Sequence, residues 1–155
     1  GPDFPIVFRW SQWKQQDYYC KIAESPAELE TFLAPLSDAG VDLFDCSTRR
    51  FWEPEFAGSH LNLAGWTKKI TGKPTMTVGS VGLERSNWLD GEDFSLTDSG
   101  LASLDPLLDR LEAGEFDLVG VGRMLISNPE WPNQLREGRL DQIRPYSNAH
   151  LMTLD

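Results

Sequence analysis

The stretch Thr75-Met76-Thr77-Val78-Gly79-Ser80-Val81-Gly82 joins a short run rich in β-branched residues to a loop with two glycines. Such a run, bounded by turn residues, is typical of a strand. The same order recurs where Leu118-Val119-Gly120-Val121 is followed by Gly122-Arg123. Glycines directly after a strand let backbone N–H groups approach a ligand closely. The sequence therefore predicts two strands that each end in a glycine-containing loop.

Two earlier strands and four helices are predicted around this pair. Ile6–Trp10 and Val41–Cys46 are apolar runs of strand length. The first helix begins at Ser25-Pro26-Ala27-Glu28, which has the order of an N-cap, a first-turn proline and a capping-box glutamate. Residues 84–100 are acidic and have no clear period, which indicates a lid or an insertion. The four predicted helices cover about residues 25–40, 63–72, 104–114 and 128–137.

Strict alternation of strands and helices predicts a parallel sheet with helical crossovers. Two architectures fit, a small doubly wound sheet or half of a (β/α)₈ barrel. A doubly wound nucleotide-binding domain normally has its glycine-rich loop after the first strand, whereas here Trp10-Ser11-Gln12-Trp13 follows that strand. Four units in 155 residues match half of a barrel of roughly 250 to 300 residues. We therefore expect residues 1–155 to be the C-terminal half of one α/β barrel domain.

Composition excludes several classes of protein. The chain is 40% hydrophobic with a formal net charge of −10 and has no cluster of basic residues, which argues against a nucleic-acid partner. No apolar run approaches the roughly 18 residues that cross a membrane. Cys20 and Cys46 form no C-x-x-C pair, so we expect reduced thiols in a cytoplasmic protein and no metal site. The chain opens with Gly1-Pro2 and no methionine, and we expect a fragment of a longer protein.

The chemistry of such barrels is found at the C-terminal ends of the strands. Loops after the last two barrel strands commonly bind a phosphate, and an arginine there can bind it through a bidentate pair of hydrogen bonds. The loops at residues 79–82 and 122–123 have this composition. A tight turn and a loop with a surface salt bridge are the structural alternatives for the two loops.

Four motifs follow one another along the chain: Phe8-Arg9-Trp10-Ser11, Gly40-Val41-Asp42-Leu43-Phe44-Asp45-Cys46-Ser47, Val78-Gly79-Ser80-Val81-Gly82 and Val121-Gly122-Arg123, the last followed by Asn128-Pro129. Taken together, they resemble the Old Yellow Enzyme family of FMN-dependent NAD(P)H oxidoreductases, many of which reduce activated C=C bonds. The resemblance covers nearly the whole chain in order, and the pair Gly122-Arg123 followed by Asn128-Pro129 is its most specific element.

The resemblance implies a cofactor and a role for each matching residue. Arg9 would lie beside the flavin ring near N1 and O2, as the catalytic residue of this chain. FMN phosphate would be bound by Ser80, Val81, Gly82, Gly122 and Arg123, with NADH or NADPH as electron donor. The histidine pair that binds the small-molecule substrate in the family comes from earlier strands, so the isolated chain is expected to be inactive. Its partner would be the missing N-terminal half or a second copy.

Other interpretations remain open from the residues alone. Arg9 could be a buried arginine paired with a carboxylate. The whole chain could belong to a phosphate-binding barrel of the isomerase or aldolase type, or be a non-catalytic half-barrel without a cofactor. The run Arg49-Arg50-Phe51-Trp52 could reach flavin or substrate, or could be a packed aromatic loop. Asp45 is interpreted as structural, and His60 as a surface histidine.

Overall fold

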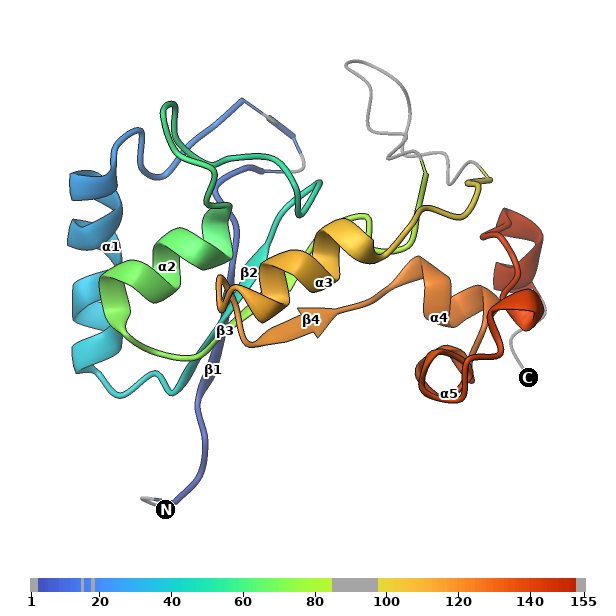
Figure 1. Cartoon of the computed structure of the whole chain (residues 1–155). Coiled ribbons are helices and arrows are strands. Elements are labelled where there is room, and N and C mark those ends of the chain that lie inside the picture. Colours follow the sequence, from blue (N-terminus) through green and yellow to red (C-terminus); the bar gives the residue numbers. More distant parts are fainter. Residues whose placement is uncertain (1–2, 15, 18, 85–97, 153–155) are drawn as a thin grey trace. The chain divides into compact units, whose positions relative to one another are not determined.

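The computed structural model describes residues 3–14, 16–17, 19–84 and 98–152. They form two compact units (Figure 1). The first, here called the sheet unit, comprises residues 1–79 and 106–120, and the second, the loop unit, comprises residues 80–105 and 121–155. The elements in chain order are β1 (Val7–Trp10), α1 (Pro26–Asp38), β2 (Leu43–Ser47), α2 (Leu63–Thr71), β3 (Thr75–Val78), α3 (Asp105–Glu112), β4 (Leu118–Gly120), α4 (Arg123–Ser127), α5 (Trp131–Arg136), and the 3₁₀ turns η1 (Leu140–Gln142) and η2 (Asn148–Met152).

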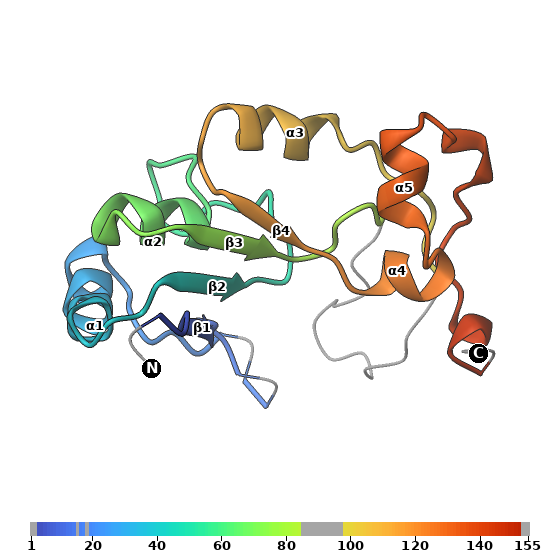
Figure 2. The ribbon, with the colours of Figure 1, turned by 90° about the horizontal axis from the view of Figure 1, so that it is seen from below.

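All four strands belong to one parallel sheet in the order β1-β2-β3-β4 (Figure 2). Each crossover between neighbouring strands contains a helix, as the alternating sequence pattern predicted. A doubly wound sheet reverses its strand order at a switch point, whereas a barrel adds strands in one direction around its axis. The order observed here has no reversal, so the fold is half of a (β/α)₈ barrel.

Helices α1 and α2 have caps that the sequence provides. Ser25 Oγ accepts the Glu28 N–H at 3.3 Å, and Pro26 occupies the first turn of α1. The Glu28 side chain accepts the Glu24 N–H, one residue earlier than a capping box would place this bond. Helix α2 ends at Gly72, whose φ of 67° is readily adopted only by glycine.

The two faces of the sheet differ in burial. One face lies against α2, and Phe44, Cys46, Thr75 and Thr77 are fully buried. The residues with the opposite parity point to the other side, here called the inner face, because side chains alternate along a strand. Arg9, Asp45, Met76 and Leu118 form one row across the inner face, in register from β1 to β4. Val7 and Leu118, at the two edges of the sheet, are 56% and 49% exposed.

The predicted elements agree with the structure to within a few residues, with one exception. Helix α4 lies between β4 and Asn128, where no helix was predicted. The final predicted helix is shorter than expected and begins at Trp131. Most of the predicted lid or insertion, residues 85–97, lies outside the described residues. The assignment of residues 1–155 to a single domain stays a prediction.

Candidate functional site

The loop after β3 is a tight turn. Leu83 N–H donates to the Ser80 carbonyl at 3.2 Å, which closes a four-residue turn. Ser80 itself has a φ of 51°, an unusual value for a residue with a side chain, and Gly82 has a φ of 72°. The loop is therefore held in a conformation that a sequence without Gly82 would adopt only with strain.

Within the loop unit, the turn packs against the segment that follows β4. A Cβ atom added to Gly82 would lie 2.9 Å from Met124 Cγ and 3.5 Å from the Trp131 ring. Met124 is the second residue of α4 and is fully buried. Only glycine permits this approach, and it brings the turn next to Gly122 and Arg123, the residues that precede Met124. The two predicted phosphate loops are thus neighbours in the structure.

The two loops contain several backbone N–H groups close to one another in the chain. Within the described part of the chain, the N–H groups of Val81, Gly82, Gly122 and Arg123 donate to no backbone carbonyl outside the helices and strands. Val81 and Gly82 are buried residues, so their N–H groups are not freely hydrated. Backbone N–H groups without acceptors are costly inside a protein unless a bound group satisfies them. These four donors have the chemistry that an anion requires.

Arg123 adds a cation to the same loops. Its guanidinium is half-buried and lies 5.7 Å from the centre of the Tyr146 ring, a cation–π contact. Burial lowers the pKa of Arg123, which the neighbouring Tyr146 partly offsets, and an arginine stays protonated nonetheless. Among the described residues, no carboxylate pairs with Arg123. The surface salt bridge that was the alternative interpretation of this arginine is therefore not seen within that part of the chain.

Arg9 belongs to the sheet unit and lies on the inner face. Its side chain is 65% exposed, so the alternative of a buried arginine does not describe it. Its Nε lies 3.7 Å from Asp45 Oδ2, and its Nη2 donates to Ser47 Oγ at 3.3 Å. Both neighbours are on β2, and they fix the guanidinium near the C-terminal end of the sheet. Arg9 is therefore both paired with a carboxylate and accessible to a ligand.

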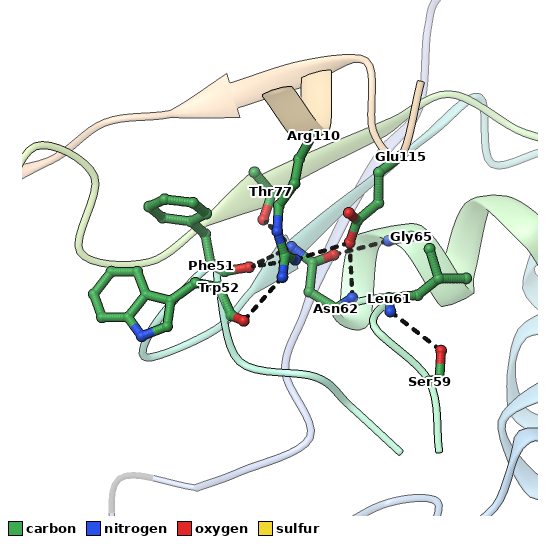
Figure 3. Close-up of polar contacts among 9 residues, drawn as sticks. All are labelled: Phe51, Trp52, Ser59, Leu61, Asn62, Gly65, Thr77, Arg110 and Glu115. Atoms are coloured by element: carbon green, nitrogen blue, oxygen red, sulfur yellow. Dashed lines mark hydrogen bonds and ion pairs between the residues drawn. The ribbon is translucent and has the colours of Figure 1, made fainter. Parts of the chain in front are cut away.

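The aromatic loop after β2 is held by a buried network (Figure 3). Asn62 Nδ2 donates to the Phe51 carbonyl at 2.8 Å and to Thr77 Oγ1 at 3.1 Å. Arg110 donates to the carbonyls of Phe51 and Trp52 at 3.3 and 3.0 Å. Phe51 is buried while Trp52 is 37% exposed, so the packed-loop interpretation holds for Phe51. Trp52 remains accessible at the end of the sheet where barrel active sites lie.

The sequence reasoning missed several residues that shape these sites. Tyr146 has no local pattern that relates it to Arg123, because the two meet only in the folded chain. Asn62 could have been found as the N-cap of α2, since its Oδ1 accepts the Gly65 N–H at 2.9 Å. The ion pair of Arg110 with the buried Glu115, at 3.1 Å, has no comparable signal.

Two proteins with sequences similar to this chain are an oxidase and a reductase. The chain matches no protein-family model. It is 28% identical to an NADH oxidase of Thermoanaerobacter brockii in an alignment of 152 positions that covers 93% of this chain and 20% of that protein. It is 24% identical to a bilirubin reductase of Clostridium symbiosum (strain WAL-14163), over 92% of this chain and 36% of that protein.

Two solved structures are similar in fold to this chain. Morphinone reductase in complex with tetrahydroNAD has a TM-score of 0.55 at 15% identity, over 89% of this chain and 30% of that one. The Old Yellow Enzyme homologue from Zymomonas mobilis has a TM-score of 0.54 at 13% identity, over 93% of this chain and 36% of that one. The chain thus has the fold of part of an Old Yellow Enzyme barrel, which confirms the predicted resemblance. It spans 20% and 36% of the length of the two curated relatives.

Proposed function

We propose that the protein is an FMN-dependent NAD(P)H oxidoreductase of the Old Yellow Enzyme type and that this chain contributes its flavin-phosphate site. The relatives by sequence are an NADH oxidase and a bilirubin reductase, which supports redox chemistry with a nicotinamide. The relatives by structure include a reductase solved with a nicotinamide analogue. Reduction of an activated C=C bond is the reaction that we propose for the native enzyme.

The observation that supports the cofactor most directly is the set of donors in the loop unit. Among the described residues, the N–H groups of Val81, Gly82, Gly122 and Arg123 donate to no backbone carbonyl outside the helices and strands, and the Arg123 guanidinium forms no ion pair with a carboxylate. A phosphate monoester offers oxygens that can accept from backbone N–H groups and from the guanidinium at once. Ser80 shapes the turn that presents these groups. The residues present therefore fit the phosphate of FMN.

Arg9, in the sheet unit, would act on the flavin ring, as the resemblance implies. Bound FMN would supply the hydride chemistry, which no side chain can perform. Arg9 would present its positive charge to the N1 and O2 edge of the flavin ring and stabilise negative charge there. Its accessible guanidinium, anchored by Asp45 and Ser47, suits this role.

We also propose that the remaining strands of the barrel pair with the two edges of this sheet. Val7 on β1 and Leu118 on β4 are about half exposed at those edges, and unpaired strand edges favour association. The partner would be the N-terminal half of the native barrel, with a second copy as the alternative. No helix among the described residues is long and apolar enough to cross a membrane. A cytoplasmic location stays a prediction.

The proposed cofactor can be tested on the native protein after its flavin has been removed. Titration with FMN and with riboflavin, followed by flavin fluorescence, isolates the contribution of the phosphate. We expect FMN to bind at least about tenfold more tightly, because one charge-assisted hydrogen bond alone is worth about 1.5 kcal/mol or more. Inorganic phosphate should compete with FMN and not with riboflavin.

Two outcomes would contradict the proposal. Equal affinities for FMN and riboflavin would show that these loops do not bind the FMN phosphate. Binding of inorganic phosphate without any affinity for flavin would instead favour the isomerase or aldolase type of barrel.

A further inference from the structure

Asp45 is the most buried charged group on the inner face of the sheet. It lies on β2 between Arg9 on β1 and Met76 on β3, its partners in register. Its exposed fraction is 6%, although Arg9 beside it is largely exposed. A carboxylate at such a position is expensive unless it is paired and hydrogen-bonded. Asp45 therefore requires an explanation beyond packing.

The hydrogen bonding of this carboxylate is incomplete. Its Oδ2 lies 3.7 Å from Arg9 Nε, a distance that favours charge attraction over a hydrogen bond. Its Oδ1 is buried and has no hydrogen-bond partner among the described residues. Burial raises the pKa of Asp45, and the charge of Arg9 opposes that rise. In this part of the chain, Arg9 is the cation that stabilises the charged form of Asp45.

The Arg9 guanidinium contacts two neighbouring side chains and also remains open to solvent. Asp45 faces the Nε side and Ser47 Oγ accepts from Nη2, while most of the side chain remains exposed. Asp45 therefore attracts one edge of the guanidinium and leaves its outer part accessible. An anionic group beside a cation also reduces the positive potential that the cation presents to a ligand.

We propose that Asp45 is a positioning residue that orients Arg9 and reduces its effective charge, so that the bound flavin has a lower reduction potential than Arg9 alone would give. This inference rests on the proposed function, because it assumes that Arg9 lies beside the flavin ring. The role of Asp45 goes beyond support of the fold, since it acts on a redox property through the charge of a second residue.

The test is the midpoint potential of FMN in the native protein, measured by spectroelectrochemistry for the wild type and three variants. Asp45→Asn keeps the size of the side chain and removes its charge. Arg9→Met removes the cation. Asp42→Asn is the matched control, because Asp42 is an exposed aspartate directly before the same strand, where its carboxylate accepts the Ile6 N–H.

We expect Asp45→Asn to make the potential more positive. A tenfold gain in the affinity for reduced FMN relative to oxidised FMN would correspond to about 30 mV for this two-electron couple. Arg9→Met should shift the potential in the negative direction, and Asp42→Asn should leave it unchanged. Asp45→Ser, also uncharged, should give the same sign as Asp45→Asn and replaces it if the latter does not fold.

The outcomes separate this inference from the proposed function. An unchanged or more negative potential in Asp45→Asn, with FMN still bound and Arg9→Met shifted, would overturn the role of Asp45 and leave the flavin site intact. An equal shift in Asp42→Asn would show a general charge effect and would also overturn it. Failure of the wild-type protein to bind FMN would overturn the proposed function itself, and the role of Asp45 with it.

Discussion

Replacement of Asn62 by alanine tests the buried network that holds the end of the sheet unit (Figure 3). The Asn62 side chain is fully buried and makes three hydrogen bonds, to the Phe51 carbonyl, to Thr77 Oγ1 and from the Gly65 N–H. Loss of the cap on α2 costs about 1 kcal/mol. Each buried group left without a partner costs about 1–3 kcal/mol.

The expected loss of stability depends on which hydrogen-bond partners of Asn62 keep another bond. The Phe51 carbonyl still accepts a hydrogen bond from Arg110 at 3.3 Å, so the loss of its bond from Asn62 costs little. Thr77 Oγ1 and the Gly65 N–H lose the partner that Asn62 supplies. We therefore expect Asn62→Ala to lower the free energy of unfolding by about 3 kcal/mol. With a urea m-value of about 2 kcal/mol/M, the midpoint would fall by about 1.5 M.

Ser25→Ala is the matched control, because Ser25 is also a helix N-cap in the sheet unit. Its single bond to the Glu28 N–H is long, at 3.3 Å, and the residue is partly exposed. The control should cost only about 0.5 kcal/mol. Urea titration of the native protein, followed by tryptophan fluorescence, measures both variants. A midpoint shift for Asn62→Ala no larger than that of the control would show that Asn62 contributes a cap and nothing more.

Three further predictions concern the cofactor, the strand edges and the thiols. Arg123→Ala should weaken FMN binding by about 1.5–3 kcal/mol, while Arg136→Ala, which removes an exposed arginine of α5, should not; titration of the native protein measures both. Light scattering on the isolated chain should report a dimer or larger species, and a cooperatively folding monomer would contradict the half-barrel edges. Burial raises the pKa of Cys46 to about 12, so at pH 8 alkylation followed by mass spectrometry should label Cys20 and leave Cys46 unmodified until the protein unfolds.

The strands and the long helices could be predicted from the sequence because each has a strong local signal. Helix α1 combines an N-cap serine with a first-turn proline, and both occupy the predicted places. Strand β3 is a β-branched run that glycine ends, and it begins and ends where predicted. Their alternation then determined the parallel topology, since a parallel connection requires a crossover.

The remaining features depend on contacts between distant residues. Helix α4 has only five residues and no side-chain cap at Gly122, so neither a period nor a cap marks it in the sequence. The register between strands also has no local signal in the sequence, and it is the register that places Asp45 beside Arg9. The same holds for the Tyr146 ring beside Arg123. The candidate residues thus come from the sequence and stay predictions, and the structure added the contact of Arg9 with Asp45 and that of Arg123 with Tyr146.

The charge balance of the chain makes the surroundings of Arg123 informative. Acidic residues outnumber basic ones by 24 to 14, so a basic side chain meets a carboxylate more readily than in a neutral protein. Arg50, Arg110 and Arg139 each have such a partner at 2.6 to 3.1 Å. Arg123 is half-buried and has none among the described residues, where it instead lies against Tyr146. In a chain with a net charge of −10, a cation that forms no ion pair favours the binding of a phosphate, and Arg123 is such a cation within the described part of the chain.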